Sequence, residues 1–446
     1  MAPEFYALLM IVFFFVALFS GMPVGFGIMA VGLVFGFLGG EGFIFNILPS
    51  KIYGVLTNYT LLTIPLFVFM GMMLERSKIA ERMLDVIGHM SGRFPGGMCL
   101  AVILVGVLMG AATGIVGASV VALTLIGLPG LLRRNHRPTL ACGTVCAAGT
   151  LGQIIPPSLV LIVLADIMNL SVGTLFAAAL MPGLLLAGLY LLYLLGLVVV
   201  SPQALPPIPQ EERDAMSASQ LAKDFLTSVV PPLILMVAVL GSIIGGFAAP
   251  TEAASVGSVG ALLLTAGFGR LNWSVFRDVC NSSLRISATI FFILIGAQVF
   301  ALAFRALSGD VLIERMFELV PGGFWGALIF MLALIFILGF FLEWIQISYI
   351  VLPLLIPFVT ELRPEVSLVW VTMLVAVNLN TSFMTPPFGW SLLFMKGVAP
   401  PGVTTGTIYR GVVPFIALQL VGLALVVLFP EIALWLPRAI GWEATQ

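Results

Sequence analysis

Charged side chains are scarce in this sequence, and that scarcity excludes a soluble globular fold. Of 446 residues, 9% are charged and 61% are hydrophobic, whereas soluble domains have about 25% charged residues. The formal net charge is −1, so the charge balance gives no indication of nucleic-acid binding. The composition predicts an all-α, polytopic membrane protein.

Histidine and cysteine are also scarce, which removes most kinds of catalytic or metal site. The two histidines, His89 and His136, are predicted in charged loops, and the four cysteines lie in or beside apolar runs. We interpret Cys142 and Cys146, one helical turn apart, as buried thiols, and no disulfide framework is indicated. The sequence has no nucleophile–base set, zinc-protease pattern or phosphate-binding loop. Neither an enzyme nor an ATP-driven pump is predicted, and no cofactor is expected.

The N-terminus lacks the features of a cleaved signal peptide. Residues 1–4 carry no positive charge, and the apolar run that follows has no small-residue cleavage site. We therefore expect this run to be a retained first span.

Two polar breaks interrupt long apolar runs, and the rest of the chain is arranged around them. The first is Gly149-Thr150-Leu151-Gly152-Gln153-Ile154-Ile155-Pro156-Pro157-Ser158, and about 230 residues later comes Asn378-Leu379-Asn380-Thr381-Ser382-Phe383-Met384-Thr385-Pro386-Pro387. A proline pair removes two backbone donors and moves the preceding residue out of the helical region. The free backbone groups are tolerated in a bilayer only inside protein or beside a water-filled cavity. Matched broken helices in two halves of a chain indicate a transporter's binding site.

The two halves have the same order of elements. The first half is read as spans 5–20, 22–40 and 60–75 with an interfacial stretch at 41–59, an amphipathic helix at 75–87, a hairpin at 96–132, a broken helix at 138–168 and a span at 173–200. The second is read as spans 225–247, 252–268 and 286–305, an amphipathic helix at 313–320, a hairpin at 324–360, a broken helix at 366–398 and a span at 408–430. Each hairpin arm has about 15 residues, short of the ~20 needed to span, so both hairpins are predicted to be re-entrant. The matched positions indicate a duplication.

These elements suggest a division into eight parts. They are scaffold helices at 1–75, an amphipathic arm at 76–94, half of a transport domain at 95–200, a cytoplasmic linker at 201–224, scaffold helices at 225–309, a second arm at 310–320, the other half of the transport domain at 321–436, and a tail at 437–446. The linker is interpreted as a solvated connector without chemistry.

The distribution of basic residues decides whether the repeats are parallel or inverted. With the loop 133–137 in the cytoplasm, fourteen of the 19 Lys and Arg residues, Arg285 among them, fall on the cytoplasmic side. This satisfies the positive-inside rule. The first hairpin then enters from the inside and the second from the outside. The repeats are therefore predicted to be inverted, with the N-terminus outside.

The hairpin tips and the breaks together present the polar groups of a binding site. We expect residues 113–119 to face 149–153, and 342–348 to face 378–382. Hydroxyls, amides and free carbonyls suit a weakly held cation such as Na⁺, and half-helix N-termini suit a carboxylate. The predicted cation-binding residues are Thr113, Gly114, Ser119, Gly149, Thr150, Gly152, Ile345, Ser348, Asn378, Asn380, Thr381 and Ser382. The predicted substrate-binding residues are Gln153, Pro156, Pro157, Ser158, Glu343, Thr385, Pro386 and Pro387. The alternative is that the small polar residues only help helices to pack.

Three acidic residues within or beside the apolar segments have different predicted roles. Glu343 lies at a hairpin tip, where a proton carrier, a cation ligand, a partner contact and a simple water-exposed group all remain open. Glu252 follows Pro250 and is expected to cap a helix start. Asp166 is expected at the outer water boundary.

These motifs resemble the large membrane subunit of tripartite ATP-independent periplasmic (TRAP) transporters. The resemblance rests on the Gly-containing tip before Ser119, on Gly149-Thr150-Leu151-Gly152 leading to Pro156-Pro157-Ser158, and on Asn378 leading to Thr385-Pro386-Pro387-Phe388-Gly389. It implies an elevator-type secondary transporter in the bacterial inner membrane. Such a transporter imports an organic acid with a Na⁺ gradient, a periplasmic binding protein and a small four-helix membrane subunit.

The second half departs from the commoner family pattern. Thr381-Ser382 stands where Ile-Gly is usual, and Leu342-Glu343-Trp344 stands where an Asp-containing tip is commoner. The Glu-Trp tip resembles a subgroup linked to 2-oxo acids or similar carboxylates. Two other functions remain open: a stand-alone Na⁺- or H⁺-coupled dicarboxylate or citrate carrier, and a channel or scaffold that does not transport.

Overall fold

The computed structural model describes residues 3–39, 42–214 and 217–442, and in this part of the chain it contains helices and no strand. The helices of the first half are α1 (Pro3–Phe19), α2 (Val24–Leu38), α3 (Ile44–Leu56), α4 (Thr63–Arg76), α5 (Ile79–Ser91), α6 (Gly97–Thr113), α7 (Val116–Arg133), α8 (Pro138–Thr150), η1 (Leu151–Gln153), α9 (Leu159–Ile167) and α10 (Val172–Val200).

A connecting segment and the second half follow. The connecting helices are η2 (Pro202–Ala204), α11 (Gln210–Asp214) and α12 (Ala218–Ser228). The second half consists of α13 (Val230–Ile244), α14 (Pro250–Gly267), α15 (Trp273–Ala306), α16 (Gly309–Glu318), α17 (Gly323–Leu338), α18 (Trp344–Gln346), the π-helix η3 (Ile347–Val351), α19 (Leu352–Glu361), α20 (Leu368–Ser382), α21 (Trp390–Val398), α22 (Thr405–Leu428) and α23 (Glu431–Ala439).

Six helices of the described residues are long and apolar enough to cross a membrane. They are Val116–Arg133, Val172–Val200, Ala218–Ile244, Trp273–Ala306, Trp344–Glu361 and Thr405–Leu428. Large apolar side chains lie exposed on several of them, including Val199 at 82%. Such surface is stable when lipid or a partner helix covers it. The all-α membrane fold is confirmed.

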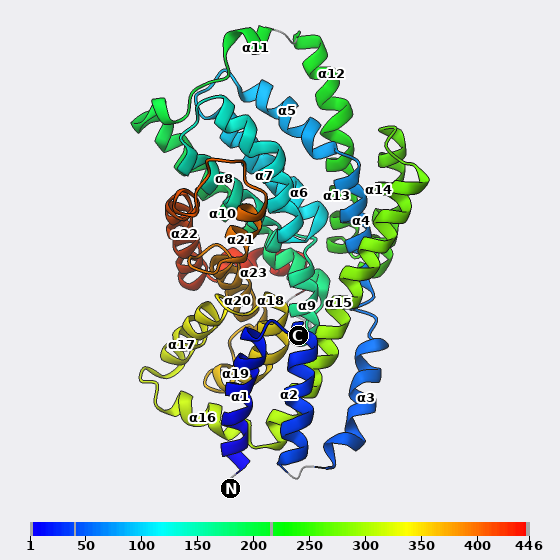
Figure 1. The fold of residues 1–446 in the computed structure, drawn as a ribbon, viewed down its shortest axis with the longest axis vertical. Coiled ribbons are helices and arrows are strands. Elements are labelled where there is room, and N and C mark those ends of the chain that lie inside the picture. The colour runs from blue at the N-terminus through cyan, green and yellow to red at the C-terminus, as the bar shows by residue number, and fades with distance from the viewer. Residues whose placement is uncertain (1–2, 40–41, 215–216, 443–446) are drawn as a thin grey trace.

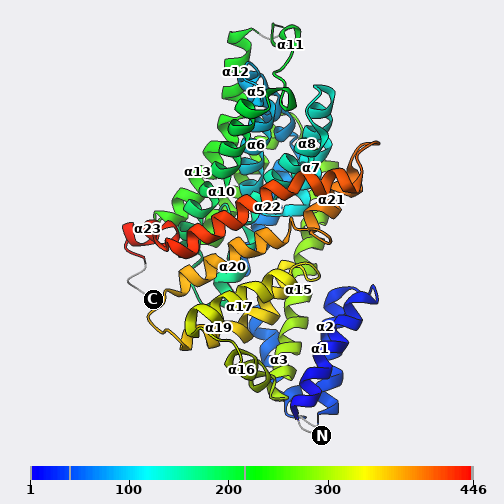
Figure 2. The same ribbon diagram turned by 90° about the vertical axis from the view of Figure 1, so that its left-hand side faces the viewer.

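The two halves have opposite directions in the molecule. Figure 1 shows α5 and the α6–α7 hairpin toward one end, whereas α16 and the α17–α19 hairpin lie toward the other. The first helix of each repeat lies beside the amphipathic helix of the other repeat. In the first repeat α1 contacts α16, and α12, which leads into the second repeat, contacts α5 (Figure 2). Arg315 of α16 forms a salt bridge of 2.8 Å with Glu4 of α1. This arrangement agrees with the predicted inverted repeats.

The helices that correspond to the predicted scaffold pair across the repeats. α2 packs along α15, and α4 packs along α14. Close packing needs small residues: a Cβ atom on Gly296 would lie 2.8 Å from the carbonyl oxygen of Gly25. The Ser258 hydroxyl of α14 donates a 2.9 Å hydrogen bond to the Leu66 carbonyl of α4. At the start of α14, the Glu252 carboxylate accepts a hydrogen bond from the Ala249 amide at 2.9 Å, so the predicted cap is confirmed.

The hairpins and broken helices, together with α10 and α22, form the second body, again with partners from both repeats. α8 packs on α7, α6 and the distant α22, while α20 packs on α17, α10 and α22. A Cβ atom on Gly411 of α22 would lie 2.0 Å from the Thr139 carbonyl oxygen of α8, so these backbones are nearly in contact. Helix α22 thus packs against the broken helices of both repeats, α8 and α20.

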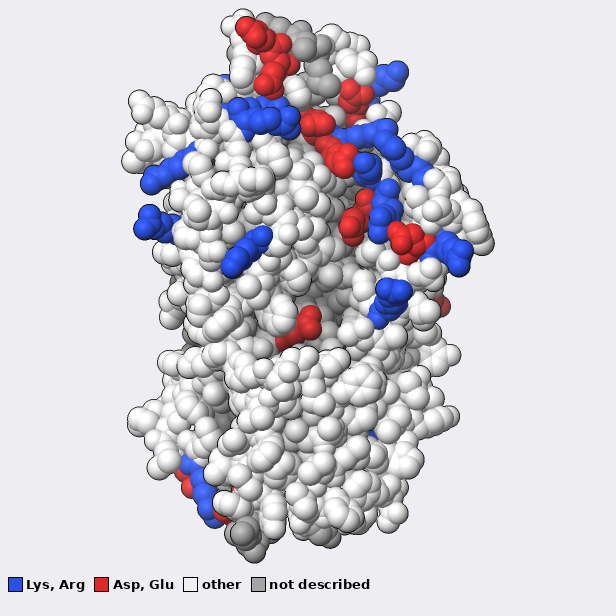
Figure 3. Space-filling model, in the orientation of Figure 1, with Lys and Arg blue, Asp and Glu red and all other residues white. Residues whose placement is uncertain are grey.

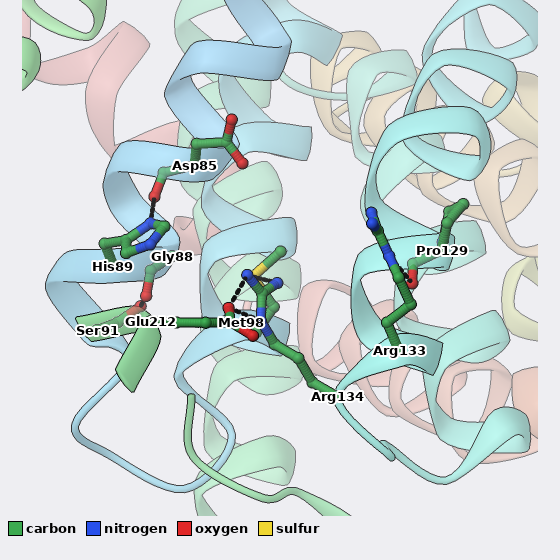
Figure 4. Close-up of polar contacts among 9 residues, drawn as sticks. All are labelled: Asp85, Gly88, His89, Ser91, Met98, Pro129, Arg133, Arg134 and Glu212. Atoms are coloured by element: carbon green, nitrogen blue, oxygen red, sulfur yellow. Dashed lines mark hydrogen bonds and ion pairs between the residues drawn. The ribbon is translucent and has the colours of Figure 1, made fainter. Parts of the chain in front are cut away.

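The connecting segment is more ordered than the expected solvated connector. The Leu205 carbonyl accepts from the Gly96 amide at 2.9 Å, the Ile208 amide donates to Gly92 at 3.0 Å, and both Leu205 and Ile208 are buried. Arg134 and Glu212 form an ion pair of 2.7 Å beside Met98 (Figure 4). These contacts attach residues 204–212 to the base of the first hairpin, while most other residues of the connecting segment are exposed.

Candidate functional site

The first hairpin tip contains two short polar side chains that form a hydrogen bond with each other. Thr113 ends α6 and Ser119 lies in the first turn of α7, and their hydroxyls are 2.8 Å apart and buried. Gly114 makes the turn with φ +60°, a conformation that favours glycine. A Cβ atom there would lie 3.2 Å from the Leu159 amide at the start of α9. The tip therefore lies directly on the second half of the broken helix.

The hairpin also packs on the end of the first half-helix. A Cβ atom on Gly152 would lie 2.4 Å from the Cα atom of Gly110 in α6, and one on Gly149 would lie 2.9 Å from the Cα atom of Val120 in α7. Both hairpin arms therefore contact the residues that precede the break. The structure brings 113–119 and 149–153 together, as the sequence predicts.

The first break is closed by its own side chains. After η1 the chain bends through the cis Pro156–Pro157 peptide to Ser158, whose hydroxyl donates a 2.5 Å hydrogen bond to the Gln153 carbonyl. The Thr150 hydroxyl donates to the Ala147 carbonyl at 3.0 Å. All residues from 151 to 158 are buried. These groups are held within protein, as free backbone in a membrane requires.

The second hairpin tip meets the second break in a corresponding way. A Cβ atom on Gly339 after α17 would lie 2.2 Å from the Ser382 hydroxyl oxygen at the end of α20. The Asn378 amide donates a 2.7 Å hydrogen bond to the Leu332 carbonyl of α17. The hydroxyls of Thr381 and Ser382 donate to carbonyls of their own helix. The second hairpin therefore lies against 378–382 through α17 and Gly339, which precede the stretch 342–348 that the sequence predicts to face them.

The second break differs from the first in exposure. It also contains a cis Pro386–Pro387 peptide, but Pro387 is exposed and its carbonyl accepts from the Tyr409 hydroxyl at 2.6 Å. The Thr385 hydroxyl donates to the Thr381 carbonyl at 2.8 Å. The Phe383 carbonyl accepts from both the amide and the hydroxyl of Ser391. Two equivalent breaks are thus closed by different donors.

Three buried polar side chains near the breaks have no partner for their functional groups. They are the amides of Gln153 and Asn380 and the hydroxyl of Ser348, all at most 1% exposed. A buried amide without a hydrogen bond costs roughly 1–3 kcal/mol. Other buried side chains, such as Thr63 and Ser283, also have no partner, but at these three predicted site residues the free groups are available to a ligand. Amide and hydroxyl oxygens are hard donors that suit Na⁺ rather than a soft metal.

A cavity of about 300 Å³ lies where both hairpin tips meet the scaffold helix α15. The first tip contributes residues 114–117, and the second contributes Glu343, Trp344 and Ile345. Leu159 at the start of α9, Phe383 in the second break and Phe394 of α21 complete one side. The opposite side is formed by Arg285, Ile286, Thr289, Ile290 and Ile293 of α15.

The cavity includes only some of the residues predicted for the substrate. Glu343 lines it, as do Gly114 and Ile345 from the predicted cation set. The other predicted substrate residues, Gln153, Pro156, Pro157, Ser158, Thr385, Pro386 and Pro387, are not part of its wall. In the first break the Ser158 hydroxyl donates its hydrogen bond to the Gln153 carbonyl, within the same segment, and not toward the cavity.

Arg285 is the charged wall residue that sequence reasoning did not assign to the site. It was grouped with the cytoplasmic basic residues, because it precedes the apolar run 286–305. In the structure, α15 begins at Trp273, so Arg285 lies 12 residues or about 18 Å along the helix. The signal that could have found it is the helical continuity of 273–306, which places this guanidinium away from the helix end.

Asp166 joins three parts of the molecule at the end of α9. Its carboxylate accepts from the Asn58 amide of the α3–α4 connection at 2.5 Å and from the Tyr349 hydroxyl of η3 at 2.8 Å. Asn58 in turn accepts from the Thr60 amide at 2.8 Å. The structure therefore gives Asp166 specific partners in addition to its place beside the helix end.

The cysteines and His136 have no contact with the cavity. Cys142 and Cys146 are buried free thiols, and the Cys146 sulfur lies 3.6 Å from the Met395 sulfur. His136 is 2% exposed rather than lying open in a charged loop. Burial lowers the pKa of His136 to about 4, so this side chain is neutral near pH 7.

Comparison with protein families gives a match over almost the whole chain. The family described as "Tripartite ATP-independent periplasmic transporter, DctM component" matches residues 11–432. A C4-dicarboxylate TRAP transporter large permease protein of Pseudomonas aeruginosa is 31% identical over 398 residues, covering 88% of this chain and 90% of that protein. A sialic acid TRAP transporter large permease protein of Vibrio cholerae is 28% identical, covering 94% and 96%.

A solved structure supports the fold. The YdaH transporter of Alcanivorax borkumensis superposes with a TM-score of 0.59 at 15% identity, covering 98% of this chain and 99% of that one. At this identity the likeness concerns the fold alone.

Proposed function

Because the chain belongs to the family of DctM components of tripartite ATP-independent periplasmic transporters, we propose that it imports an organic acid with a Na⁺ gradient. As a large permease of this family, it is a membrane transport subunit that works with a substrate-binding protein. The finer proposal is that the acid is a carboxylate released by a periplasmic binding protein into the cavity beside α15. The cavity carries this proposal, because it is where both repeats and the scaffold meet.

The coupling ion is proposed to bind beside the hairpin tips. The Thr113 and Ser119 hydroxyls form one polar pair. The unpartnered groups of Ser348, Asn380 and Gln153 are proposed as further ligands, although the sequence alone assigns Gln153 to the substrate. The first hairpin tip lies at the start of α9, and the second hairpin lies at the end of α20. A bound cation would satisfy buried oxygens that otherwise have no partner, which links Na⁺ binding to closure of the tips.

Transport is proposed to follow an elevator movement of the second body against the scaffold. The scaffold is formed by the α2–α15 and α4–α14 pairs, and the moving body contains both hairpins and both broken helices. The amphipathic helices α5 and α16 connect them at opposite ends (Figure 1). Movement as one unit would expose the cavity on alternate sides without opening the breaks to lipid.

The charge distribution supports a direction for the chain in the membrane. Figure 3 shows Lys and Arg side chains gathered over the end that carries α5, α11 and α12, while the opposite half of this face is nearly free of charge. By the positive-inside rule we propose that this end is cytoplasmic and the N-terminus periplasmic. A small four-helix membrane subunit is proposed to cover exposed apolar scaffold surface, such as Phe247 at 88% and Val256 at 70%.

The test is uptake into proteoliposomes that contain this chain and its small subunit. Radiolabelled carboxylates are added with or without a Na⁺ gradient and with or without the periplasmic binding protein. Uptake that needs both is the expected result. Uptake that needs the gradient but no binding protein would instead identify a stand-alone carrier, and flux that neither saturates nor depends on a gradient would identify a channel.

A further inference from the structure

We propose that the cavity beside α15 selects a monocarboxylate with an apolar body, which Arg285 binds and which Glu343 distinguishes from dicarboxylates. This inference rests on the proposed transport function and concerns the same cavity. Neither the family match nor the relatives' names fix the substrate, because the two relatives described above are named for C4-dicarboxylates and for sialic acid.

Arg285 supplies the positive charge in the wall. It is exposed on α15 and has no salt bridge among the described residues. A guanidinium presents parallel N–H groups that match the two oxygens of a carboxylate. The Thr289 hydroxyl lies one helical turn further along the same wall. It donates a 2.9 Å hydrogen bond to the Arg285 backbone carbonyl, so it can only accept from a ligand, for example from a 2-hydroxy group. One end of the cavity is therefore suited to a single carboxylate.

The rest of the wall is apolar. The aliphatic residues are Ile115, Val116, Leu159, Ile286, Ile290, Ile293 and Ile345, and the aromatic residues are Trp344, Phe383 and Phe394. A polyhydroxylated acid would leave hydroxyls without partners against this surface, at about 1–3 kcal/mol each. A branched or aromatic body would instead remove apolar surface from water. The lining thus favours a carboxylate with a compact hydrophobic body.

Glu343 makes a second carboxylate unfavourable. It is half-buried in the opposite wall, on the second hairpin tip, and its cavity neighbour of opposite charge is Arg285. The cavity wall supplies one cationic group, so the second carboxylate of a dianion would lie beside the Glu343 carboxyl and apolar side chains without a cation to pair with. A ligand with a single carboxylate, bound at Arg285, does not meet this cost. Discrimination against a dianion comes from this unpaired second charge as much as from the attraction of a monoanion to Arg285.

The experiment measures competition against uptake in the reconstituted system with the small subunit and binding protein. The unlabelled probes are pyruvate, 4-methyl-2-oxopentanoate, phenylpyruvate and succinate. Because the binding protein also selects, the same acids are tested as direct ligands of the purified permease complex by shifts in thermal unfolding. We expect the branched and aromatic 2-oxo acids to bind the permease more tightly than pyruvate, and succinate to bind weakest.

Variants separate the two charged residues. Arg285→Ala is expected to weaken the binding of monocarboxylates by roughly 10- to 100-fold, since a hydrogen bond to a charged group is lost. Arg285→Lys is expected to recover part of this affinity. Glu343→Gln is expected to reduce the preference for monocarboxylate over succinate. Arg277→Ala is the matched control, because Arg277 is an exposed residue of the same helix outside the cavity wall.

The outcomes distinguish this inference from the proposed function. Tightest permease binding by succinate, or wild-type affinities in Arg285→Ala, would overturn the inference while Na⁺- and binding-protein-dependent uptake persists. An unchanged preference in Glu343→Gln would remove Glu343 from the discrimination. Absence of gradient-dependent uptake for every acid would instead overturn the proposed function.

Discussion

Asn378 and Asn380 lie two residues apart in α20, but their amides have different surroundings. Asn378 donates to the Leu332 carbonyl of the second hairpin at 2.7 Å, whereas both amide atoms of Asn380 are buried without a partner. Sequence reasoning assigned both to the cation site, because both precede the break. The polarity of an amide can be predicted from sequence, but whether it is already hydrogen-bonded depends on α17, which is about 40 residues away. The structure thus favours Asn380 over Asn378 as a ligand.

The two positions should respond differently to alanine. Asn378→Ala removes a hydrogen bond and should lower the free energy of unfolding by about 1 kcal/mol. Asn380→Ala removes an unsatisfied group and should keep stability, while raising the Na⁺ concentration for half-maximal uptake about two- to tenfold. Thermal unfolding in detergent and Na⁺ activation curves measure the two effects. If Asn380→Ala left the Na⁺ curve unchanged, Asn380 would not be a ligand.

At the scale of helices, the breaks and tips were the most predictable features. Both breaks lie at the predicted prolines, because a missing backbone donor acts locally and needs no tertiary contact. The position of Arg285 in the cavity wall depended on how far α15 extends and on which hairpin it faces. The docking of residues 204–208 could not be predicted either, since its hydrogen bonds use backbone atoms that every residue has. The C-terminal helix α23 was likewise not predicted, and it crosses the predicted boundary between the transport-domain half 321–436 and the tail 437–446.

The contact between the first hairpin and its break predicts a steric effect. Gly152→Ala should separate η1 from α6, because the new Cβ atom would lie 2.4 Å from the backbone of Gly110. Overpacking of this kind costs about 1–3 kcal/mol, so we expect a lower unfolding temperature and reduced uptake. Gly188→Ala in α10 is the control, since nothing lies within 4 Å of its added Cβ atom. Equal unfolding temperatures and equal uptake of the two variants would show that α6 and η1 can separate without loss of stability.

For the whole molecule, the elevator proposal requires that some contacts between the scaffold and the moving body break during each transport cycle. The hydrogen bond between Asn58 and Asp166 is such a contact, because Asn58 precedes scaffold helix α4 while Asp166 ends α9 of the moving body. The Ser258–Leu66 hydrogen bond joins two scaffold helices and would not change. The inverted repeat could be predicted from the order of elements and the basic residues. Which surfaces separate during transport could not, because both bodies draw helices from each half.

These two contacts predict opposite results for cross-linking. In a Cys280→Ser background, which removes the one native cysteine that is not fully buried, Asn58→Cys with Asp166→Cys is treated with a short reversible thiol cross-linker. We expect uptake to stop and to return on reduction, because the cross-link holds the moving body against the scaffold. Leu66→Cys with Ser258→Cys should cross-link and still transport, since both residues belong to the scaffold. Full uptake by the cross-linked 58–166 pair would mean that α9 and the α3–α4 connection stay together through the cycle, and the boundary of the moving body would then exclude α9.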